Sequence, residues 1–243
     1  MEITPFYDKK IDCINCNHHF TTTRIRSRFV RIASHDTDFK PNYTDNNVNP
    51  TFYNVSVCPQ CGFAFTDETS PYFPPGAQDV IRNSVTAKWN GRSFSAIRDI
   101  DEAIESYKLA YLSGKLKKEK PISLAGLTLR VAWLYRQKGQ SDEEMRFLTI
   151  ARDMYADSYS EGDYVGTQMT ETRVLYLIAE LSRRIGDEEE AVRGFSRVIE
   201  QQRTSIEPQI IEMAKERWRE MRETKKEPVL GPLNGVKNLT NRN

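Results

Sequence analysis

The sequence predicts an α+β protein, in which a small cysteine-containing β module precedes an all-α array of helical hairpins. Three observations lead to this class: two Cys-x-x-Cys clusters near the start, alternating apolar residues around them, and helical periodicity from about residue 77 onward. We expect the β module to cover residues 1–76 and the helical region residues 77–227. Residues 228–243 have no periodicity, and a disordered tail is expected there.

Composition and charge limit the classes of function. The chain has 243 residues, of which 38% are hydrophobic, and this favours two modest units over one large core. Charged residues make up 28%, but their net charge is only +1, so no global field favours nucleic acid or a membrane surface. No apolar run approaches the roughly 18 residues of a spanning helix, and the N-terminus has no signal-peptide pattern. A cytoplasmic protein without a membrane role is expected.

The four cysteines of the chain form two pairs with the same spacing. They are Cys13, Cys16, Cys58 and Cys61. Two intervening residues allow one tight turn to direct both sulfurs of a pair toward one ion, which suits tetrahedral Zn²⁺. Four thiolates leave no position for a substrate, so one structural zinc per chain is expected. Two unrelated thiol pairs or a redox dithiol are the alternatives, although a reducing cytosol favours the metal.

Strands are predicted next to the clusters. Residues 21–29 alternate, with Arg24, Arg26 and Arg28 on one side, and residues 52–57 are rich in aromatic and β-branched residues. We expect these segments to pair, with a loop over residues 41–50, where turn-forming residues are concentrated. Two knuckles that bracket antiparallel strands make a zinc ribbon, and the 41 residues between the second and third cysteines predict an insertion in it.

Proline and glycine at residues 71–76 mark a boundary, after which the apolar period becomes helical. A first, poorly defined helix is expected around Val80 to Trp89, and a clearer one runs from Ile100 until Gly114. The remaining helices are predicted at residues 124–138, 142–158, 170–185, 187–202 and 206–225.

The two central helix pairs resemble each other. Ala132 precedes Gly139 by seven residues, and Ala179 precedes Gly186 by the same distance. Small residues at such positions allow paired helices to approach closely, and the glycines allow a sharp turn. The pattern resembles tetratricopeptide-type repeats, with a connection lengthened around residues 161–163 because the period is 47 residues. Ordinary antiparallel helices with similar faces are the alternative.

The three histidines allow further sites. His18 or His19 could replace a cysteine as a metal ligand, although four cysteines make this unnecessary. An enzyme would have its acid and base at His35, Asp36 and Asp38. A simpler interpretation is that both aspartates cap turns and pair with nearby arginines, namely Arg24, Arg26, Arg28 or Arg31.

The arginines of the first predicted strand suggest a second function. Arg24, Arg26 and Arg28 could contact phosphates beside aromatic residues, as ribbon folds in nucleic-acid-binding proteins do. Acidic residues balance basic ones through residues 1–76, which argues against such binding.

Several segments together resemble a family of uncharacterised bacterial proteins, known as a domain of unknown function. They are residues 5–10, both cysteine clusters, residues 36–39, 57–64, 103–110, 129–136 and 176–184. The resemblance implies a split four-cysteine ribbon before a repeat-like helical region, in a cytosolic protein of Gram-positive type without an assigned activity. Ala179 stands where this family is expected to carry glycine, a change that a helix interior tolerates.

The sequence therefore favours a non-enzymatic zinc-binding interaction module, whose stacked hairpins form a groove for a protein or peptide. Nucleic-acid binding through the ribbon and an enzyme centred on His35 are the alternatives. Six polar or aromatic residues are candidates for the lining of the groove: Arg130, Tyr135, Arg136, Glu180, Arg183 and Arg184. Ordinary interhelical salt bridges would also account for them.

Overall fold

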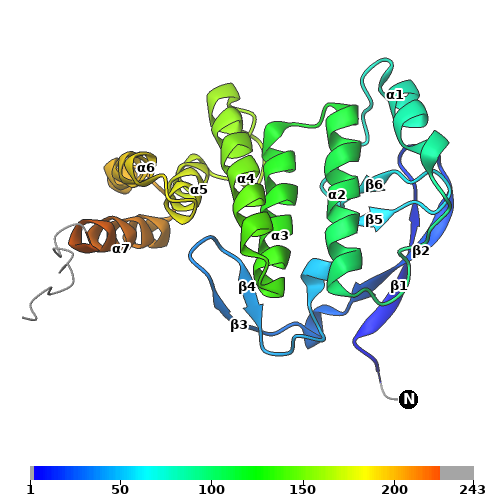
Figure 1. The fold of residues 1–243 in the computed structure, drawn as a ribbon, viewed down its shortest axis with the longest axis horizontal. Coiled ribbons are helices and arrows are strands. Elements are labelled where there is room, and N and C mark those ends of the chain that lie inside the picture. Colours follow the sequence, from blue (N-terminus) through cyan, green and yellow to red (C-terminus); the bar gives the residue numbers. More distant parts are fainter. Residues whose placement is uncertain (1–2, 225–243) are drawn as a thin grey trace, which may run out of the picture.

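The computed structural model describes residues 3–224, and within this range the chain is α+β, as predicted (Figure 1). The N-terminal part holds three antiparallel hairpins. Their strands are β1 (Phe6–Asp12) with β2 (His19–Ile25), β3 (Ile32–His35) with β4 (Pro41–Tyr43), and β5 (Ser56–Val57) with β6 (Ala64–Phe65). The predicted tail at residues 228–243 lies outside the described residues.

The predicted pairing of residues 21–29 with residues 52–57 is wrong. β2 pairs with β1 over its whole length, from Phe6 opposite Ile25 to Asp12 opposite His19. Residues 50–53 form a 3-10 turn, and β5 pairs with β6. Each cysteine knuckle is the turn of its own hairpin, and closing a short turn costs less chain entropy than closing the long insertion. Strands therefore pair across the knuckles.

The insertion between the knuckles is itself a hairpin, so the predicted loop at residues 41–50 is wrong for its first part. β4 pairs with β3, and the turn between them contains Phe39 in the left-handed region at φ +66°. Figure 1 shows this hairpin beneath α4 and close to α5, away from the other strands. A segment from the middle of the β region thus reaches the helical part.

Seven α-helices follow within the described residues. They are α1 (Ala77–Ser84), α2 (Ile100–Lys117), α3 (Pro121–Lys138), α4 (Ser141–Glu161), α5 (Glu171–Arg184), α6 (Glu188–Glu200) and α7 (Pro208–Thr224). The first predicted helix is shorter than expected, because α1 ends at Ser84 and a 3-10 turn follows at residues 86–88. Gly114 does not end α2; it lies inside the helix, where an added Cβ would be 2.8 Å from Leu124.

Local signals explain several helix ends. Asp99 and Glu102 form a capping box at the start of α2, and Thr170 caps α5 through the backbone N–H of Arg173. Gly139 adopts φ +70° just after α3, a conformation that costs glycine little. The long connection predicted near residues 161–163 begins after α4 ends at Glu161.

The helices from α2 to α7 pack mainly against their neighbours in the chain. α5 and α6 approach closely where Ala179 faces Gly194, since an added Cβ on Gly194 would lie 2.7 Å from the Ala179 Cβ. Small residues were expected at such contacts. The likeness to tetratricopeptide repeats remains a prediction, because ordinary antiparallel helices pack in the same order.

One hydrophobic cluster joins the β region to the helices. Val55, Val57 and Ala64 pack with residues of α2, α3, α4 and α5. The buried Arg98, just before α2, donates hydrogen bonds to the carbonyl groups of Phe52 and Val55. The core thus continues across residue 76, and the division into two domains stays a prediction. Within residues 3–224 no helix has the length and apolar character to cross a membrane.

Candidate metal centre and the neighbouring polar network

The structure brings the four cysteines together, as the spacing predicted. Their sulfur atoms all lie within 4.8 Å of one another. The Sγ atoms of Cys13 and Cys61 are 3.7 Å apart, as are those of Cys16 and Cys58. A tetrahedral ion with metal–sulfur bonds of about 2.3 Å requires edges of about 3.8 Å between its ligands. Disulfide bonds are far shorter, at about 2.05 Å, so the arrangement fits four ligands of one metal ion.

The two knuckles have the same backbone structure. The N–H of Asn17 donates to the carbonyl of Cys13 at 2.8 Å, and the N–H of Gly62 donates to that of Cys58 at 2.9 Å. Asn17 and Gly62 both have positive φ, at +59° and +72°. Glycine adopts this conformation most readily, and asparagine is among the few other residues that tolerate it. Both hairpins therefore present their cysteines in the same way.

The four sulfurs cannot all be negative at these distances unless a cation lies among them. Hydrogen bonds with Cys58 and Cys61, together with burial, raise the pKa of Cys13. Hydrogen bonds from Cys13 and Cys58 lower the pKa of Cys61 to about 2. The site thus accommodates a thiolate but has little tolerance for several. A metal ion would take the place of the shared protons.

Residues after the second knuckle hold it from outside. The Trp89 indole N–H donates to the carbonyl of Pro59 at 2.9 Å, and the Thr86 hydroxyl donates to that of Cys61 at 3.0 Å. The ring of Trp89 lies against Gly62, where an added Cβ would be 2.6 Å away. Side chains of α1 complete the apolar surroundings of the cysteines. The metal centre therefore depends on residues on both sides of the predicted domain boundary.

Neither His18 nor His19 joins the cysteine group within the described residues. His19 contacts the carboxylate of Asp12 with its ring Nδ1 and is exposed, and the ring of His18 stacks on Phe20. The four cysteines thus provide the complete candidate ligand set.

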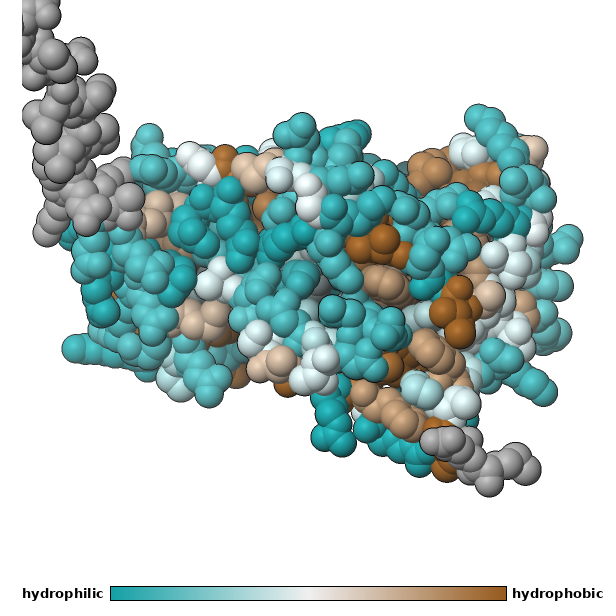
Figure 2. All heavy atoms as spheres, turned by 60° about the horizontal axis from the view of Figure 1, so that its bottom comes forward, coloured by the Kyte–Doolittle hydropathy of each residue, from teal (hydrophilic) through white to brown (hydrophobic). Residues whose placement is uncertain are grey.

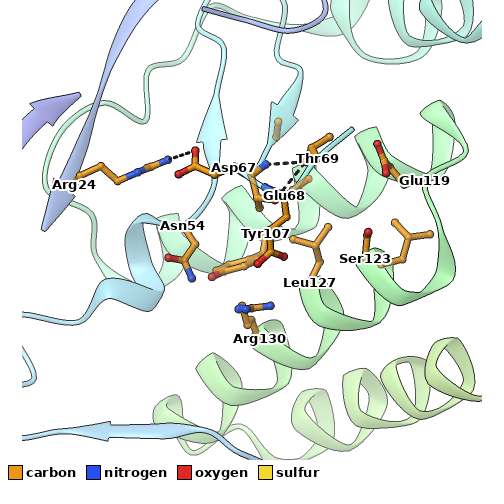
Figure 3. Close-up of a pocket in the computed structure, with 15 residues that line it drawn as sticks. Arg24, Asn54, Asp67, Glu68, Thr69, Tyr107, Glu119, Ser123, Leu127 and Arg130 are labelled. Carbon is orange, nitrogen blue, oxygen red and sulfur yellow. Dashed lines mark hydrogen bonds and ion pairs between the residues drawn. The ribbon is translucent and has the colours of Figure 1, made fainter. Parts of the chain in front are cut away.

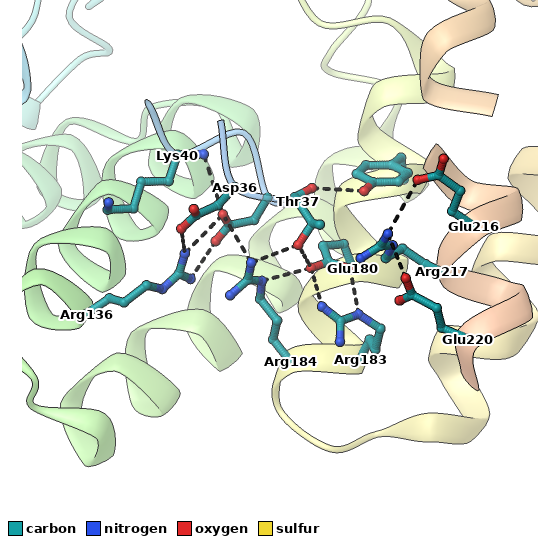
Figure 4. Close-up of polar contacts among 12 residues, drawn as sticks. Asp36, Thr37, Lys40, Arg136, Glu180, Arg183, Arg184, Glu216, Arg217 and Glu220 are labelled. Carbon is teal, nitrogen blue, oxygen red and sulfur yellow. Dashed lines mark hydrogen bonds and ion pairs between the residues drawn. The ribbon is translucent and has the colours of Figure 1, made fainter. Parts of the chain in front are cut away.

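The turn of the β3–β4 hairpin is bound to α3 by a second polar cluster. Asp38 is fully buried and accepts hydrogen bonds from the Trp133 indole at 3.1 Å and from Arg136 at 2.6 Å. Arg136 also donates to Asp36 at 2.8 Å (Figure 4) and to Glu144 at 2.6 Å. One guanidinium thus connects both aspartates of the turn to two helices.

The same turn is bound to α5. Glu180 is fully buried and accepts hydrogen bonds from Arg183 and Arg184, both at 2.8 Å, and from the hydroxyl of Thr37. Arg184 donates to the Thr37 hydroxyl, and the Tyr176 hydroxyl donates to the Thr37 carbonyl at 2.9 Å (Figure 4). The hairpin turn is therefore hydrogen-bonded to both α3 and α5.

The predicted partners of the two aspartates are wrong. Asp36 and Asp38 were expected to pair with arginines in or just after the predicted strand at residues 21–29. They pair instead with Arg136 on α3. Arg184 on α5 also lies near Asp38. The hairpin extends away from β2, so the nearest arginines in sequence are not the nearest in space.

The candidate partner-binding residues divide into two groups. Arg136, Glu180, Arg183 and Arg184 belong to the network around the hairpin turn. Tyr135 is buried, stacks on Phe147 and accepts a hydrogen bond from Lys108 at 2.6 Å. Arg130 differs from all of these, because it lines a cavity and donates only to the carbonyl of Gly126 (Figure 3).

The residues of the enzyme hypothesis lie in different surroundings. His35 is exposed and lines an open hollow of about 590 Å³ together with residues of α5 and α7. Asp36 and Asp38 are both hydrogen-bonded to Arg136, and the enzyme hypothesis stays a prediction.

The three arginines of the nucleic-acid hypothesis do not share one face, contrary to the predicted alternation. Arg24 is largely buried and donates to the Ser56 hydroxyl at 2.9 Å. β2 ends at Ile25, and Arg28 belongs to the 3-10 turn that follows it. Arg26 and Arg28 are exposed and lie over aromatic rings. Nucleic-acid binding stays a prediction.

Sequence reasoning missed the contact of Asp38 with Trp133. A signal for part of it exists, because Trp133 and Arg136 are three residues apart and therefore share one face of α3. Nothing in the sequence indicates that this face receives a carboxylate from a hairpin about a hundred residues earlier.

Comparisons with known proteins place the chain in a family but find no solved structure that matches it. A relative from Borreliella burgdorferi, described as an uncharacterized protein, is 25% identical over 170 residues, which cover 63% of this chain and 61% of the relative. The model of one family matches residues 6–221, a range that contains both knuckles and nearly all of the helices. The chain belongs to the bacterial family described as "Uncharacterized protein conserved in bacteria (DUF2225)".

Proposed function

We propose that this protein is a cytoplasmic zinc protein in which one structural Zn²⁺ supports a non-enzymatic interaction module. The observation that supports the metal site is the cluster of four sulfur atoms, in which two Sγ–Sγ distances are 3.7 Å. All four positions of a tetrahedral ion are then protein ligands, and no position remains for water or substrate. The ion would fix the two knuckle hairpins to each other.

Zinc is favoured among the metals that thiolates bind. Tetrahedral sites with four sulfurs hold zinc or iron, and zinc has no redox chemistry that would require access to a reductant. The ligands come from two local turns with N–H groups directed toward the sulfurs, as in zinc knuckles.

Metal analysis of the purified protein tests this proposal. We expect one zinc per chain and no visible absorption from iron, and we expect Cys58→Ser to lose the metal. His18→Ala is the matched control, because this histidine follows a knuckle but is not among the proposed ligands, and it should keep a full equivalent of zinc. A folded protein that contains no metal, or that loses zinc on the His18→Ala change, would contradict the assignment.

The interaction role is supported by the arrangement of the helices and by the surface. Helices α2 to α7 pack in chain order, which is the arrangement that forms extended grooves in repeat proteins. On the face shown in Figure 2, hydrophilic residues predominate and hydrophobic ones form small separate groups, so a partner would be recognised there mainly by polar contacts. Among the charged candidate residues for the groove, Arg130 is the one without an ion-pair partner within residues 3–224.

Affinity capture from native bacterial cytosol tests the interaction role. The wild-type protein, Arg130→Ala and the control Arg193→Ala are compared. Arg193 lies on α6 and forms exposed pairs with two glutamates, so its loss should leave capture unchanged. A partner that is retained by the control and reduced several-fold by Arg130→Ala supports the proposal. Identical capture by all three proteins would remove Arg130 from it.

A further inference from the structure

A cavity lies beside the β3–β4 hairpin, between α3 and α5. Its volume is about 500 Å³, within the range of small-molecule sites. α3 contributes Leu129, Arg130 and Trp133, α4 contributes Tyr155, and α5 contributes Leu177. The exposed segment of residues 166–168 and the side chain of Glu68 lie at its edge. The cavity walls therefore combine apolar and aromatic side chains with polar ones, among them the guanidinium groups of Arg130 and Arg173.

Arg130 also borders a second hollow of about 220 Å³ on the other side of α3, close to Tyr107 (Figure 3). Its Nη1 donates to the carbonyl of Gly126 at 3.0 Å, one turn earlier in the same helix. A Cβ on Gly126 would lie 3.1 Å from this nitrogen, so glycine leaves room for the guanidinium to lie along the helix. The side chain is thus held at the boundary between the two spaces.

Arg130 is half-buried and has no carboxylate at ion-pair distance within the described part of the chain. Among the other charged groups that line the cavity, Glu68 also has no ion-pair partner within the described residues, whereas two are paired. Asp38 pairs with Arg136, and Arg173 pairs with Glu207. A guanidinium without a counter-ion at the edge of a cavity is a ready partner for an anion.

Tyr155 supplies a second polar group. Its side chain is only 4% exposed, and within residues 3–224 its hydroxyl makes no hydrogen bond. Burial raises the pKa of Tyr155 to about 12, so the hydroxyl keeps its proton at neutral pH and can donate it. Because Tyr155 lines the cavity, a ligand or water there could accept the hydrogen bond of its hydroxyl.

We propose that this cavity binds a small organic carboxylate with an aromatic or aliphatic body. One guanidinium and one phenol match the two oxygens of a single carboxylate, and Leu129, Trp133 and Leu177 would cover its apolar part. A phosphate is less suitable, because it would bring up to two charges toward one arginine and toward the carboxylate of Glu68. This inference rests on the proposed function, in which the helical region binds a partner. It adds the chemical class of a ligand for the cavity.

A competing explanation involves Glu68. This exposed carboxylate borders the same two hollows as Arg130, so the two side chains could serve each other as distant counter-ions. Under our proposal Glu68 repels an anionic ligand, and Glu68→Gln should strengthen binding. Under the competing explanation Arg130 has no role in ligand binding, and Glu68→Gln leaves binding unchanged.

Calorimetry and ligand-observed NMR with the full-length, metal-loaded protein test the inference. The probes are 3-phenylpropionate, its neutral amide 3-phenylpropionamide, and inorganic phosphate. We expect the carboxylate to bind at least about tenfold more tightly than the amide, because only the carboxylate forms charge-assisted hydrogen bonds, and we expect phosphate to bind more weakly still. Equal binding of carboxylate and amide, or no binding of the carboxylate at millimolar concentration, would overturn the inference.

Three variants locate the site. Arg130→Gln should weaken carboxylate binding at least about tenfold, and Tyr155→Phe by about threefold to tenfold, the value of one neutral hydrogen bond. Glu68→Gln should tighten it. Circular dichroism and zinc content, measured in parallel, should remain those of the wild type. Unchanged affinity in a folded Arg130→Gln protein would show that the carboxylate binds elsewhere.

The outcomes separate this inference from the proposed function. If no carboxylate binds but capture of a macromolecular partner still depends on Arg130, the inference alone fails. If the NMR spectra show that bound 3-phenylpropionate is converted to a product, the non-enzymatic role fails and the carboxylate site stands. The zinc measurement is independent of both.

Discussion

The knuckle hairpins and the β3–β4 hairpin are both too short to be stable alone, yet the molecule stabilises them in opposite ways. Among the described residues, the cysteines gather only four other buried side chains in their cluster, from Phe63, Phe65, Ile81 and Val85. The β3 strand is exposed along its whole length, whereas the turn that follows it contains the fully buried Asp38. In our proposal the first region depends on a metal ion held by two local turns, whereas the second is held by ion pairs with distant helices.

This difference sets the size of the expected effects. Metal binding in small zinc modules contributes on the order of 10 kcal/mol, and it acts on the folding of the ligand-bearing segments themselves. Breaking a buried ion pair costs about 3–5 kcal/mol, since it leaves a buried charge without a partner. Exposed pairs contribute about 0–1 kcal/mol. Perturbing each region separately should therefore show whether the two are independent.

Removal of the metal should give the largest effect. We expect chelation to increase hydrogen exchange strongly in β1, β2, β6 and α1, because side chains of these elements pack in the cluster around the cysteines. The β3–β4 turn lies between the knuckles in sequence, yet it should stay protected, because Arg136 and Arg184 hold it on the helices. Exchange mass spectrometry with and without chelator measures this pattern.

Re-addition of zinc serves as the control and should restore protection. Loss of protection in the β3–β4 turn together with the knuckles would show that the metal supports both regions. The two regions would then not be stabilised in different ways. Unchanged exchange throughout would show that the knuckles fold without an ion.

Asp38→Asn should give the second-largest effect, a loss of about 3 kcal/mol in the free energy of unfolding. Both carboxylate oxygens of Asp38 accept hydrogen bonds, from Trp133 and Arg136 on one oxygen and from Arg136 and the Lys40 N–H on the other. In asparagine one of these two oxygens is replaced by an NH₂ group, which cannot accept a hydrogen bond. In either orientation of the amide, the donors on one side therefore lose their acceptor. Urea unfolding followed by circular dichroism measures the change.

Glu189→Gln is the matched control, since Glu189 pairs with Arg193 on the exposed surface of α6. It should change the free energy of unfolding by less than about 0.5 kcal/mol. Zinc content should be normal in both variants. A cost for Asp38→Asn no larger than that of the control would mean that the hairpin turn does not depend on its buried charge.

The same contrast explains which features were predictable from the sequence. The cysteine site depends on spacing within two turns, so Cys13 with Cys16 and Cys58 with Cys61 identify it directly. Helix ends were also predictable from local sequence signals, such as the glycine at residue 139. Strand pairing was predicted wrongly, because nothing in the composition of residues 52–57 indicates whether their partner lies across the second knuckle or across the insertion.

The polar network could not be predicted for a different reason. Any aspartate attracts any arginine, so the charges of Asp36 and Asp38 do not select Arg136 over Arg24. The choice is made by the packing of α3 and α5, which brings their arginines to one place. The cavity at Arg130 follows from the same packing, since it is the part of the space between these helices that the hairpin turn leaves unfilled.

The smallest expected effect concerns pH. Partial burial favours the neutral form of Asp36, but hydrogen bonds from Asn42 and Arg136 outweigh it and lower the pKa of this carboxyl below its usual value. A lowered folded-state pKa stabilises the protein above the unfolded-state pKa of about 3.9, and the contribution is lost as the pH falls through the folded-state value. Asp36→Asn should therefore cost about 1 kcal/mol or less at pH 7.

The difference in unfolding free energy between wild type and Asp36→Asn should stay constant from pH 7 to about pH 5, begin to fall near pH 4, and disappear only once the pH is below the folded-state pKa of Asp36. Acid also protonates cysteines, but both proteins share this loss of metal, so it cancels in the difference. A difference that grew on acidification would mean that the folded state favours the protonated form of Asp36. The ion pair with Arg136 would then contribute nothing to holding the hairpin turn on α3, and Asp38 alone would account for its attachment.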